Sequence, residues 1–347
     1  MDPRWNELAE ILVNYSTEVQ PGDRVMIAML ELEAHPLAVA VYEAVIRAGG
    51  YPQIQFLSER LRHAVMVNGN RDQIGWVPEI EAYGMEWADV YYGLRAAANP
   101  FEHADIPDDV LALHQSAMGK ISTMRWEKTR WCLVRVPTVA LAQQAEMSVS
   151  SLSAMFFDAC LLDWEKESEA WHQMALTFEG VSGVQILGED TDLRFSVEGR
   201  RWIVLDGTLN MPDGEIFTAP VNATLNGAIT FELPAVYGGR VMEGIRLCWE
   251  DGRLVEATSR TNEGYLHQIV RSDPGAGRLG EFGMGTNPAI THYCKDRLLD
   301  EKIGGTVHVA LGRAYPQCGG ENDSAIHWDI VKDLRRGGKV LFDGQVI

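Results

Sequence analysis

The sequence predicts an α/β protein of two domains, an N-terminal parallel β-α-β domain followed by a β-rich α+β domain. Its 347 residues exceed the usual length of one domain and favour about two. Up to about residue 180, strand-like runs alternate with segments of helical spacing; beyond it, glycine-containing turns separate short strand patterns. We therefore expect domains at residues 1–180 and 181–347, the second carrying the functional site.

The first elements form a strand-helix-strand series. Residues 5–15 carry one apolar stripe at helical spacing, and residues 21–29 have the composition of a buried strand. Residues 35–50 place Pro36 in a first helical turn and end at two glycines, as helices commonly do. Residues 51–57 then resume as a strand, which predicts two parallel strands joined by a right-handed crossover.

Later segments complete the two predicted domains. Residues 126–140 hold another strand that ends at Pro137, and residues 148–179 form a long helical region. Farther along, Asp251 and Gly252 separate two alternating segments, which is a strong hairpin signal.

Composition excludes several classes of protein. The formal net charge of −19 argues against binding nucleic acid or an anionic membrane, because both need a cationic surface. The N-terminus has no signal-peptide pattern, and no apolar run is long enough to span a membrane. The five cysteines are scattered and never form a C-x-x-C pair, so neither a disulfide framework nor a thiolate metal site is expected. We expect a cytoplasmic protein with reduced thiols.

One apolar, strand-like region near the C-terminus carries His308, His327 and Asp329. Because alternate residues of a strand point to the same face, His327 and Asp329 form a compact pair of ligands, to which His308 can add a third. Two histidines and a carboxylate suit zinc, cobalt, manganese or iron(II). The alternative is a set of core histidines that bond to backbone carbonyls or to Asp329.

Two isolated glutamates extend this set. Glu215 and Glu281 each stand among small, uncharged residues. Glutamate is rarely buried unless it is paired or binds a cation, although a solvated turn is the alternative for each. The glycines of residues 275–285 match no phosphate-binding motif, and close backbone approach to a buried site explains them better. Glu301 is interpreted as a solvated turn residue. The alternative is that its side chain orients one of the metal ligands.

Several long segments resemble the motifs of one metallopeptidase family. The segments GEIFTAP, RLGEFGMGTNPAI, DEKIGGTVHVALGRAY and NDSAIHWD are similar, in the same order, to those of the aminopeptidase T and aminopeptidase S family, which includes PepS-like enzymes. The resemblance implies a two-domain exopeptidase with two divalent ions of zinc, cobalt or manganese. It also implies a homodimer that encloses its active sites and admits short peptides.

The resemblance further assigns roles to six residues. It implies that the metal ligands are Glu215, Glu281, His308, His327 and Asp329, and that Tyr315 lies at the catalytic centre. Three carboxylates and two divalent ions leave a charge of about +1, which can stabilise an oxyanion. Glu281 is the leading candidate for proton transfer, and either Glu281 or Asp329 can bridge the ions. The Tyr315 phenol would donate a hydrogen bond to the oxyanion.

Two other functions remain as alternatives. Relatives of this family include mononuclear iron(II) dioxygenases that open hydroxypyridine rings, and a facial triad of His308, His327 and Asp329 would suffice for that chemistry. Such an enzyme has no need for Glu215 and Glu281, whose presence favours hydrolysis. A non-catalytic protein with a structural metal is the third and least favoured possibility.

Overall fold

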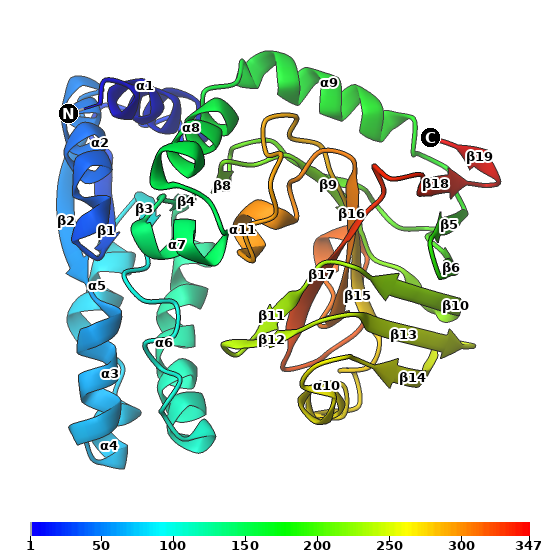
Figure 1. Ribbon diagram of the computed structural model, residues 1–347. Helices are drawn as coiled ribbons and strands as arrows, with labels where there is room; N and C mark the ends of the chain where they lie inside the picture. Colours follow the sequence, from blue (N-terminus) through cyan, green and yellow to red (C-terminus); the bar gives the residue numbers. More distant parts are fainter. Residues whose placement is uncertain (1) are drawn as a thin grey trace. The chain divides into compact units, whose positions relative to one another are not determined.

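The computed structural model describes residues 2–347, which divide into two compact units (Figure 1). The first unit comprises Met1–Trp164 with Gly207–Pro212, and the second comprises Glu165–Asp206 with Asp213–Ile347. A domain border at residue 180 stays a proposal, because the two units interleave along the chain. Within residues 2–347, no helix combines the length and the apolar character needed to cross a membrane.

The first unit is built on a parallel five-stranded sheet with the order β2-β1-β3-β4-β8. Its strands are β1 (Arg24–Leu30), β2 (Tyr51–Leu57), β3 (Val90–Arg95), β4 (Arg130–Arg135) and β8 (Asn210–Met211). Strand β1 pairs in parallel with both β2 and β3, which confirms the predicted β-α-β unit. The order reverses at β1, since the chain adds β2 on one side of it and β3 on the other.

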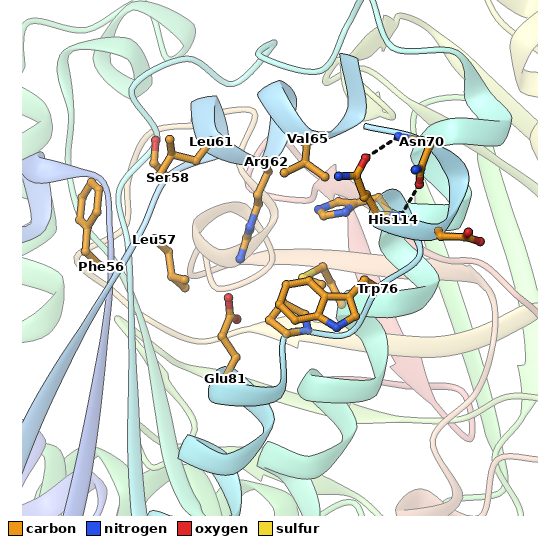
Figure 2. A pocket seen from close by; sticks show the side chains of 14 residues that line it. Phe56, Leu57, Ser58, Leu61, Arg62, Val65, Asn70, Trp76, Glu81 and His114 are labelled. Atoms are coloured by element: carbon orange, nitrogen blue, oxygen red, sulfur yellow. Dashed lines mark hydrogen bonds between the residues drawn. The ribbon is translucent and has the colours of Figure 1, made fainter. Parts of the chain in front are cut away.

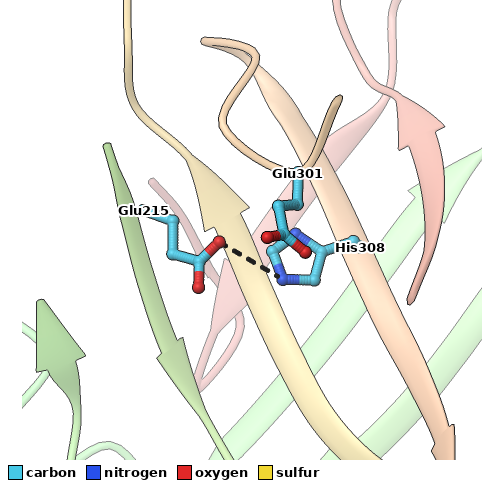
Figure 3. Close-up of side chains that lie close together, drawn as sticks. All are labelled: Glu215, Glu301 and His308. Atoms are coloured by element: carbon cyan, nitrogen blue, oxygen red, sulfur yellow. Dashed lines mark ion pairs between the residues drawn. The ribbon is translucent and has the colours of Figure 1, made fainter. Parts of the chain in front are cut away.

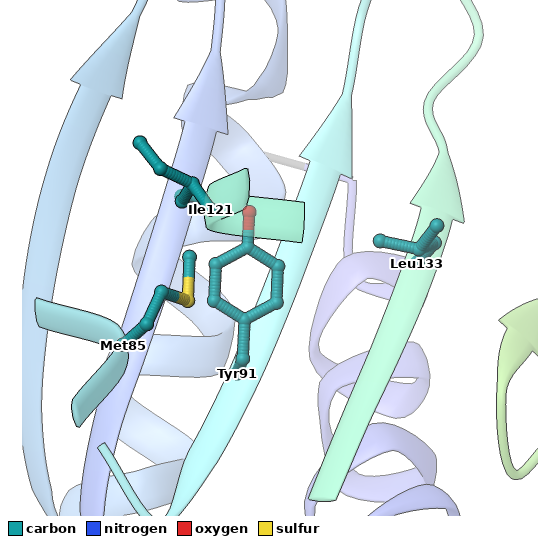
Figure 4. Packing of buried hydrophobic residues seen from close by; sticks show 5 residues of the cluster. Met85, Tyr91, Ile121 and Leu133 are labelled. Atoms are coloured by element: carbon teal, nitrogen blue, oxygen red, sulfur yellow. The ribbon is translucent and has the colours of Figure 1, made fainter. Parts of the chain in front are cut away.

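Helices connect these strands and cover the sheet. They are α1 (Arg4–Ile11), α2 (His35–Arg47), α3 (Glu59–Asn68), α4 (Arg71–Ile74), α5 (Glu79–Trp87), α6 (Asp108–Lys128), α7 (Val139–Gln144) and α8 (Val149–Cys160). On one sheet face, Met85 of α5 and Ile121 of α6 pack against Tyr91 and Leu133 of the strands (Figure 4). The helical region expected over residues 148–179 consists of α8 and α9 (Trp164–Leu176), with residues 161–163 between them.

The second unit contains two antiparallel sheets. Their strands are β5 (Gly183–Gly188), β6 (Thr191–Ser196), β7 (Ile203–Leu205), β9 (Glu215–Thr218), β10 (Val221–Phe231), β13 (Ile245–Glu250), β14 (Arg253–Thr258), β15 (Leu279–Gly285), β16 (Thr306–Gly312), β17 (His327–Asp333), β18 (Lys339–Phe342) and β19 (Gln345–Val346). One sheet has the order β14-β13-β10-β6-β5-β18-β19 and the other β17-β16-β15-β9-β7. The unit also contains a hairpin of β11 (Ala235–Tyr237) and β12 (Arg240–Met242). Two short helices complete it, α10 (Glu263–Ile269) and α11 (Arg297–Asp300).

The predicted hairpin at Asp251 and Gly252 is present. Strands β13 and β14 pair on either side of it, and both turn residues have positive φ, as a type I′ turn requires. A Cβ atom at Gly252 would also collide with the backbone carbonyl of Asn222, so only glycine fits there.

In the second unit, a hydrophobic core lies between the two antiparallel sheets. It fixes which face of the sheet β17-β16-β15-β9-β7 is turned towards the other sheet. Phe282 of β15 packs edge to face on Phe195 of β6, with ring centroids 5.3 Å apart. In the same row, Val309 and Ile330 are buried beside Phe282. Because strand side chains alternate, the residues adjacent to these three point to the opposite face, where the polar residues gather.

Candidate metal centre

Four neighbouring strands place the five predicted ligands on one face of the sheet. Glu215 begins β9, Glu281 lies in β15, His308 in β16, and His327 and Asp329 in β17. Cross-strand pairing places Glu281, Ala310 and Asp329 in one row and His308 in another row of the same face. These residues are separated by up to 114 positions in sequence, so only strand pairing brings them together.

Each predicted ligand has a glycine or alanine as a cross-strand partner, which keeps the face open. At position 283, a Cβ atom would overlap the imidazole of His308. Gly283 is therefore explained by close approach to a buried side chain, whereas Gly280 and Gly285 of the same strand lie against backbone carbonyls of Arg313 and Ile303. The pairs are Glu215 with Gly285, Glu281 with Ala310, His308 with Gly283, His327 with Gly312, and Asp329 with Ala310.

The five side chains form a continuous buried cluster in which Glu281 lies between the two histidines. The Nε2 atom of His308 lies 3.0 Å from Oε1 of Glu281 and 3.9 Å from Oε2 of Glu215. The Nε2 atom of His327 lies 3.5 Å from Oε2 of Glu281 and 3.5 Å from Oδ1 of Asp329. None of these side chains is more than 8% exposed.

The donor atoms fall into two groups that each suit a divalent cation. Glu215, Glu301 and His308 form one group (Figure 3), and Glu281, His327 and Asp329 form the other, with ligand atoms within 4.8 Å of one another in each. Among the described residues, Oδ1 of Asp329 is buried without a hydrogen-bond partner, as is Nδ1 of His308. Buried carboxylates and imidazoles with an unsatisfied oxygen fit zinc, cobalt or manganese.

The structure adds Lys302 and Asp213, which the sequence did not indicate, and decides between the two interpretations of Glu301. Glu301 is only 8% exposed, so its interpretation as a solvated turn residue is wrong. Lys302 is fully buried, with its Nζ 2.7 Å from Oε2 of Glu215, 3.0 Å from Oε1 of Glu301 and 3.6 Å from Oδ1 of Asp213. The only sequence signal is an acidic residue and a lysine before an apolar strand, a pattern that does not distinguish a turn from an interior ion pair.

Charges within the cluster shift the pKa values of both histidines in the metal-free chain. Burial opposes the charged imidazolium, but the hydrogen bond to Glu281 and the charges of Glu215, Glu281 and Asp329 raise the pKa of His308 to about 9. Burial also lowers the pKa of His327, but the interactions with Asp329 and Glu281 outweigh it and raise this pKa to about 9. In return, His327 lowers the pKa of the Asp329 carboxyl despite its burial.

The Glu215 end of the cluster contains a fixed positive charge. Burial raises the pKa of Glu215 to about 8, although the ammonium of Lys302 opposes this shift. The pKa of Lys302 lies well above its ordinary value in spite of burial, because Glu215, Glu301 and Asp213 surround it. Lys302 therefore stays protonated and partly neutralises the carboxylates at this end.

Tyr315 lies beside His327, the first residue of β17. Its ring packs edge to face against His327, with centroids 4.9 Å apart, and against Phe217 at 5.7 Å. Burial and the charges of Glu281 and Asp329 raise the pKa of its phenol, so the hydroxyl keeps its proton at neutral pH. Arg297 lies 3.8 Å from the buried Asp329, and its charge helps to lower the pKa of that carboxyl group.

Buried carboxylate and imidazole donors on one sheet face make a candidate divalent-metal site, of the kind found in metallohydrolases. The family model described as thermophilic metalloprotease (M29) matches residues 1–339, and the chain belongs to this family. The resemblance found in the sequence motifs is thereby confirmed.

Individual relatives cover nearly the whole chain. Aminopeptidase 2 of Geobacillus stearothermophilus is 24% identical over 384 residues, which cover 94% of this chain and 92% of the relative. The structure of wild-type AmpT from Thermus thermophilus is similar with a TM-score of 0.85 and 22% identity, covering 99% of this chain and 96% of that one. The 2,5-dihydroxypyridine dioxygenase of Pseudomonas putida KT2440 has a TM-score of 0.62 and 14% identity, covering 99% and 94%. At these identities the two structures show the fold alone, and they confirm the predicted α/β class.

Proposed function

We propose that this chain is a metal-dependent aminopeptidase that releases N-terminal residues from short peptides at a dinuclear centre. The proposed ligands are Glu215, Glu281, His308, His327 and Asp329, and the proposed ions are two of zinc, cobalt or manganese. The observation that carries the proposal is the position of Glu281, whose two oxygens face His308 and His327, one from each group of donors. Membership of the metalloprotease family and the aminopeptidase names of its relatives support the reaction class.

The chain's own residues supply the remaining parts of the reaction. When bound, divalent ions polarise a peptide carbonyl and lower the pKa of water, so that a nucleophile is available at neutral pH. Glu281 takes the proton of that water and delivers it to the leaving amine, because its carboxylate lies at the middle of the cluster. Tyr315, whose phenol stays protonated beside His327, donates a hydrogen bond to the oxyanion.

The charge of the whole chain suits a substrate with a free N-terminus. The net charge of −19 attracts the α-ammonium group of a peptide. We further propose a homodimer and a cytoplasmic location, the second supported by five cysteines that are all free thiols.

Metal stoichiometry and peptidase activity test the proposal together. Elemental analysis should find about two zinc, cobalt or manganese ions per chain. Aminoacyl-p-nitroanilides should be hydrolysed, and a chelator should abolish this activity until metal is restored. Glu281→Gln should lose activity, whereas Glu250→Gln, an exposed glutamate of the same unit, should keep it. Fewer than one bound ion per chain together with no hydrolysis would contradict the proposal.

The likeness to the ring-cleaving dioxygenase defines the second candidate function. That function would use a single iron(II) held by His308, His327 and Asp329 and would leave Glu215 without a role. One iron per chain, oxygen uptake with 2,5-dihydroxypyridine and no peptidase activity would support it. Retention of oxygenase activity in Glu215→Gln would separate the two candidates further.

A further inference from the structure

An exposed arginine lies beside the candidate metal centre. Arg297 begins α11, and its Nη1 atom is 3.8 Å from Oδ2 of Asp329. Among the described residues, Arg297 and Lys302 are the two lysine or arginine side chains within ion-pair distance of a proposed ligand carboxylate. Lys302 is fully buried, whereas 56% of the Arg297 side chain is exposed. Arg297 is therefore the cation of this site that a substrate can reach.

The guanidinium of Arg297 has unused hydrogen-bonding capacity. At 3.8 Å, its contact with Asp329 is an ion pair and is too long for a hydrogen bond. Within residues 2–347 it donates no hydrogen bond. Asp329 is itself a proposed metal ligand and also lies 3.5 Å from Nε2 of His327, so its charge is shared. A guanidinium carries five N–H donors in a planar fork that fits a carboxylate, and here these donors are available.

Several arginines elsewhere in the chain have closer carboxylate partners. Arg62 lines a cavity of about 660 Å³ in the first unit (Figure 2), and it pairs with Glu59 at 2.7 Å. In the second unit, Arg335 pairs with Asp333 at 2.8 Å. The longer contact of Arg297 indicates that its guanidinium is not committed to a partner within the chain.

The charges that act on Arg297 come from the candidate site. Partial removal from water lowers the pKa of Arg297, but the charges of Asp329, Glu301 and Tyr315 outweigh this effect and raise the pKa above its ordinary value. The charge of Arg297 acts in turn on Tyr315, whose pKa burial and the carboxylates nevertheless keep raised. Arg297 thus stays charged next to the residues to which the reaction is assigned.

Every short peptide with a free C-terminus carries one carboxylate that a cation can bind. In a dipeptide, the carbon of the scissile carbonyl and the carboxyl carbon are three bonds apart, or roughly 3–4 Å. Each further residue adds up to about 3.5 Å. A carbonyl held among the proposed ligands leaves the carboxylate of a dipeptide within reach of Arg297, which lies 3.8 Å from one of those ligands. The carboxylate of a longer peptide lies beyond it.

The acidity of the chain gives such a cation a purpose. The net charge of −19 attracts the ammonium end of a peptide and repels its carboxylate end. One accessible arginine at the site offsets this repulsion locally. We propose, on the basis of the aminopeptidase function proposed above, that Arg297 binds the C-terminal carboxylate of the substrate and that dipeptides are therefore the preferred substrates.

Three substrates with the same N-terminal residue X test this inference on the full-length, metal-loaded chain. They are the dipeptide X-Gly, its amide X-Gly-NH2 and the p-nitroanilide of X, where X is the residue of the best p-nitroanilide substrate. X-Gly should be hydrolysed with a kcat/KM about tenfold or more above that of its amide, because a charge-assisted hydrogen bond contributes a factor of this size. Equal values for X-Gly and its amide would overturn the inference, while hydrolysis of the p-nitroanilide would leave the proposed function intact.

Substitutions assign the effect to Arg297. Arg297→Met should lower kcat/KM for X-Gly about tenfold or more, mainly through a higher KM, and should leave the amide and the p-nitroanilide unchanged. Arg297→Lys should keep part of the preference, because an ammonium retains the charge without the planar fork. Arg336→Met, at an exposed arginine of the same unit, should match the unaltered chain.

Metal content and kcat separate carboxylate binding from the other roles open to Arg297. If Arg297 only orients Asp329, Arg297→Met should lower the number of bound ions found by elemental analysis and should slow all three substrates equally. If Arg297 stabilises the oxyanion, kcat should fall for all three substrates at unchanged metal content. Either result would overturn the inference. Absence of hydrolysis of all three substrates by the unaltered chain would contradict the proposed function, and this inference with it.

Discussion

Gly283 lies directly opposite His308 in the pairing of β15 with β16, and the imidazole occupies the space that a Cβ atom at position 283 would fill. The position of the His308 ring therefore depends on the absence of a side chain at position 283. A histidine on one strand can lie over its neighbour only where that neighbour has no side chain. The glycine is thus part of the proposed metal centre although it has no donor atom.

Gly283→Ala should displace the His308 ring and lower the metal content by about one ion per chain. Peptidase activity should fall roughly 100-fold or more, since misplacement of a site group by about 1 Å has this effect. Elemental analysis and p-nitroanilide hydrolysis measure the two results. Gly264→Ala is the matched control, because no atom lies within 4 Å of the added Cβ position there. Full metal content in Gly283→Ala would refute the prediction.

Lys302→Met should destabilise the metal-free chain much more than the metal-loaded chain. The substitution removes the ammonium group that pairs with Glu215, Glu301 and Asp213 in the interior, at a cost of about 3–5 kcal/mol in the free energy of unfolding. Bound divalent ions should recover part of that loss. Denaturant unfolding with and without chelator measures the difference, and Lys339→Met, an exposed lysine, serves as control. An equal loss in both states would show that Lys302 has no electrostatic role at the site.

Metal affinity should increase as the pH rises from about 6.5 to 9. The folded, metal-free chain raises the pKa of His308 and His327 to about 9 from an ordinary value of 6.5. Protonated histidines therefore stabilise the metal-free fold fully below pH 6.5, and this contribution is lost as the pH rises through 9. Because a metal must displace the same protons, its binding becomes tighter over that range.

Competition with a chelating dye at pH 6, 7, 8 and 9 measures the affinity, and calorimetry in two buffers measures proton release. The His327→Gln variant should show a weaker pH dependence than the unaltered chain, while His172→Gln, an exposed histidine, should not differ from it. An affinity that is constant or falls between pH 6.5 and 9 would contradict the assignment of these histidines.

Tyr315→Phe should reduce kcat by about 10²–10³-fold while the metal content and KM stay unchanged. The phenylalanine keeps the packing against His327 and Phe217 but removes the hydroxyl that would bind the oxyanion. Steady-state kinetics and elemental analysis test both parts. Tyr237→Phe, at a half-buried tyrosine of the same unit, is the control. A rise in KM at constant kcat would indicate a role in substrate binding instead.

The elements of the fold were largely predictable because their signals are local. The alternation of apolar residues, Pro36 in a first helical turn, and the Asp251-Gly252 turn each act within a few residues, and the corresponding elements are present. The position of the helix break at residues 161–163 was not predictable from periodicity, since both flanking segments have helical spacing.

The candidate site was predictable only in part, for a similar reason. His327 and Asp329 share a strand, and a period of two places them on the same face without further information. Glu301 and Lys302 stand in a segment whose charges are as typical of a turn as of an interior ion pair, and burial is a property of the whole fold.

The sequence by itself determined the alternation of each strand, the hairpin turn, the motifs that indicate a metallopeptidase and the acidic charge of the chain. Only the tertiary structure decided which strands are neighbours. Strand pairing places Glu215 beside β15, and the turn that follows α11 buries Lys302 among three carboxylates. Those contacts join residues far apart in the chain, and their strength depends on the exclusion of water, which no local pattern of residues specifies.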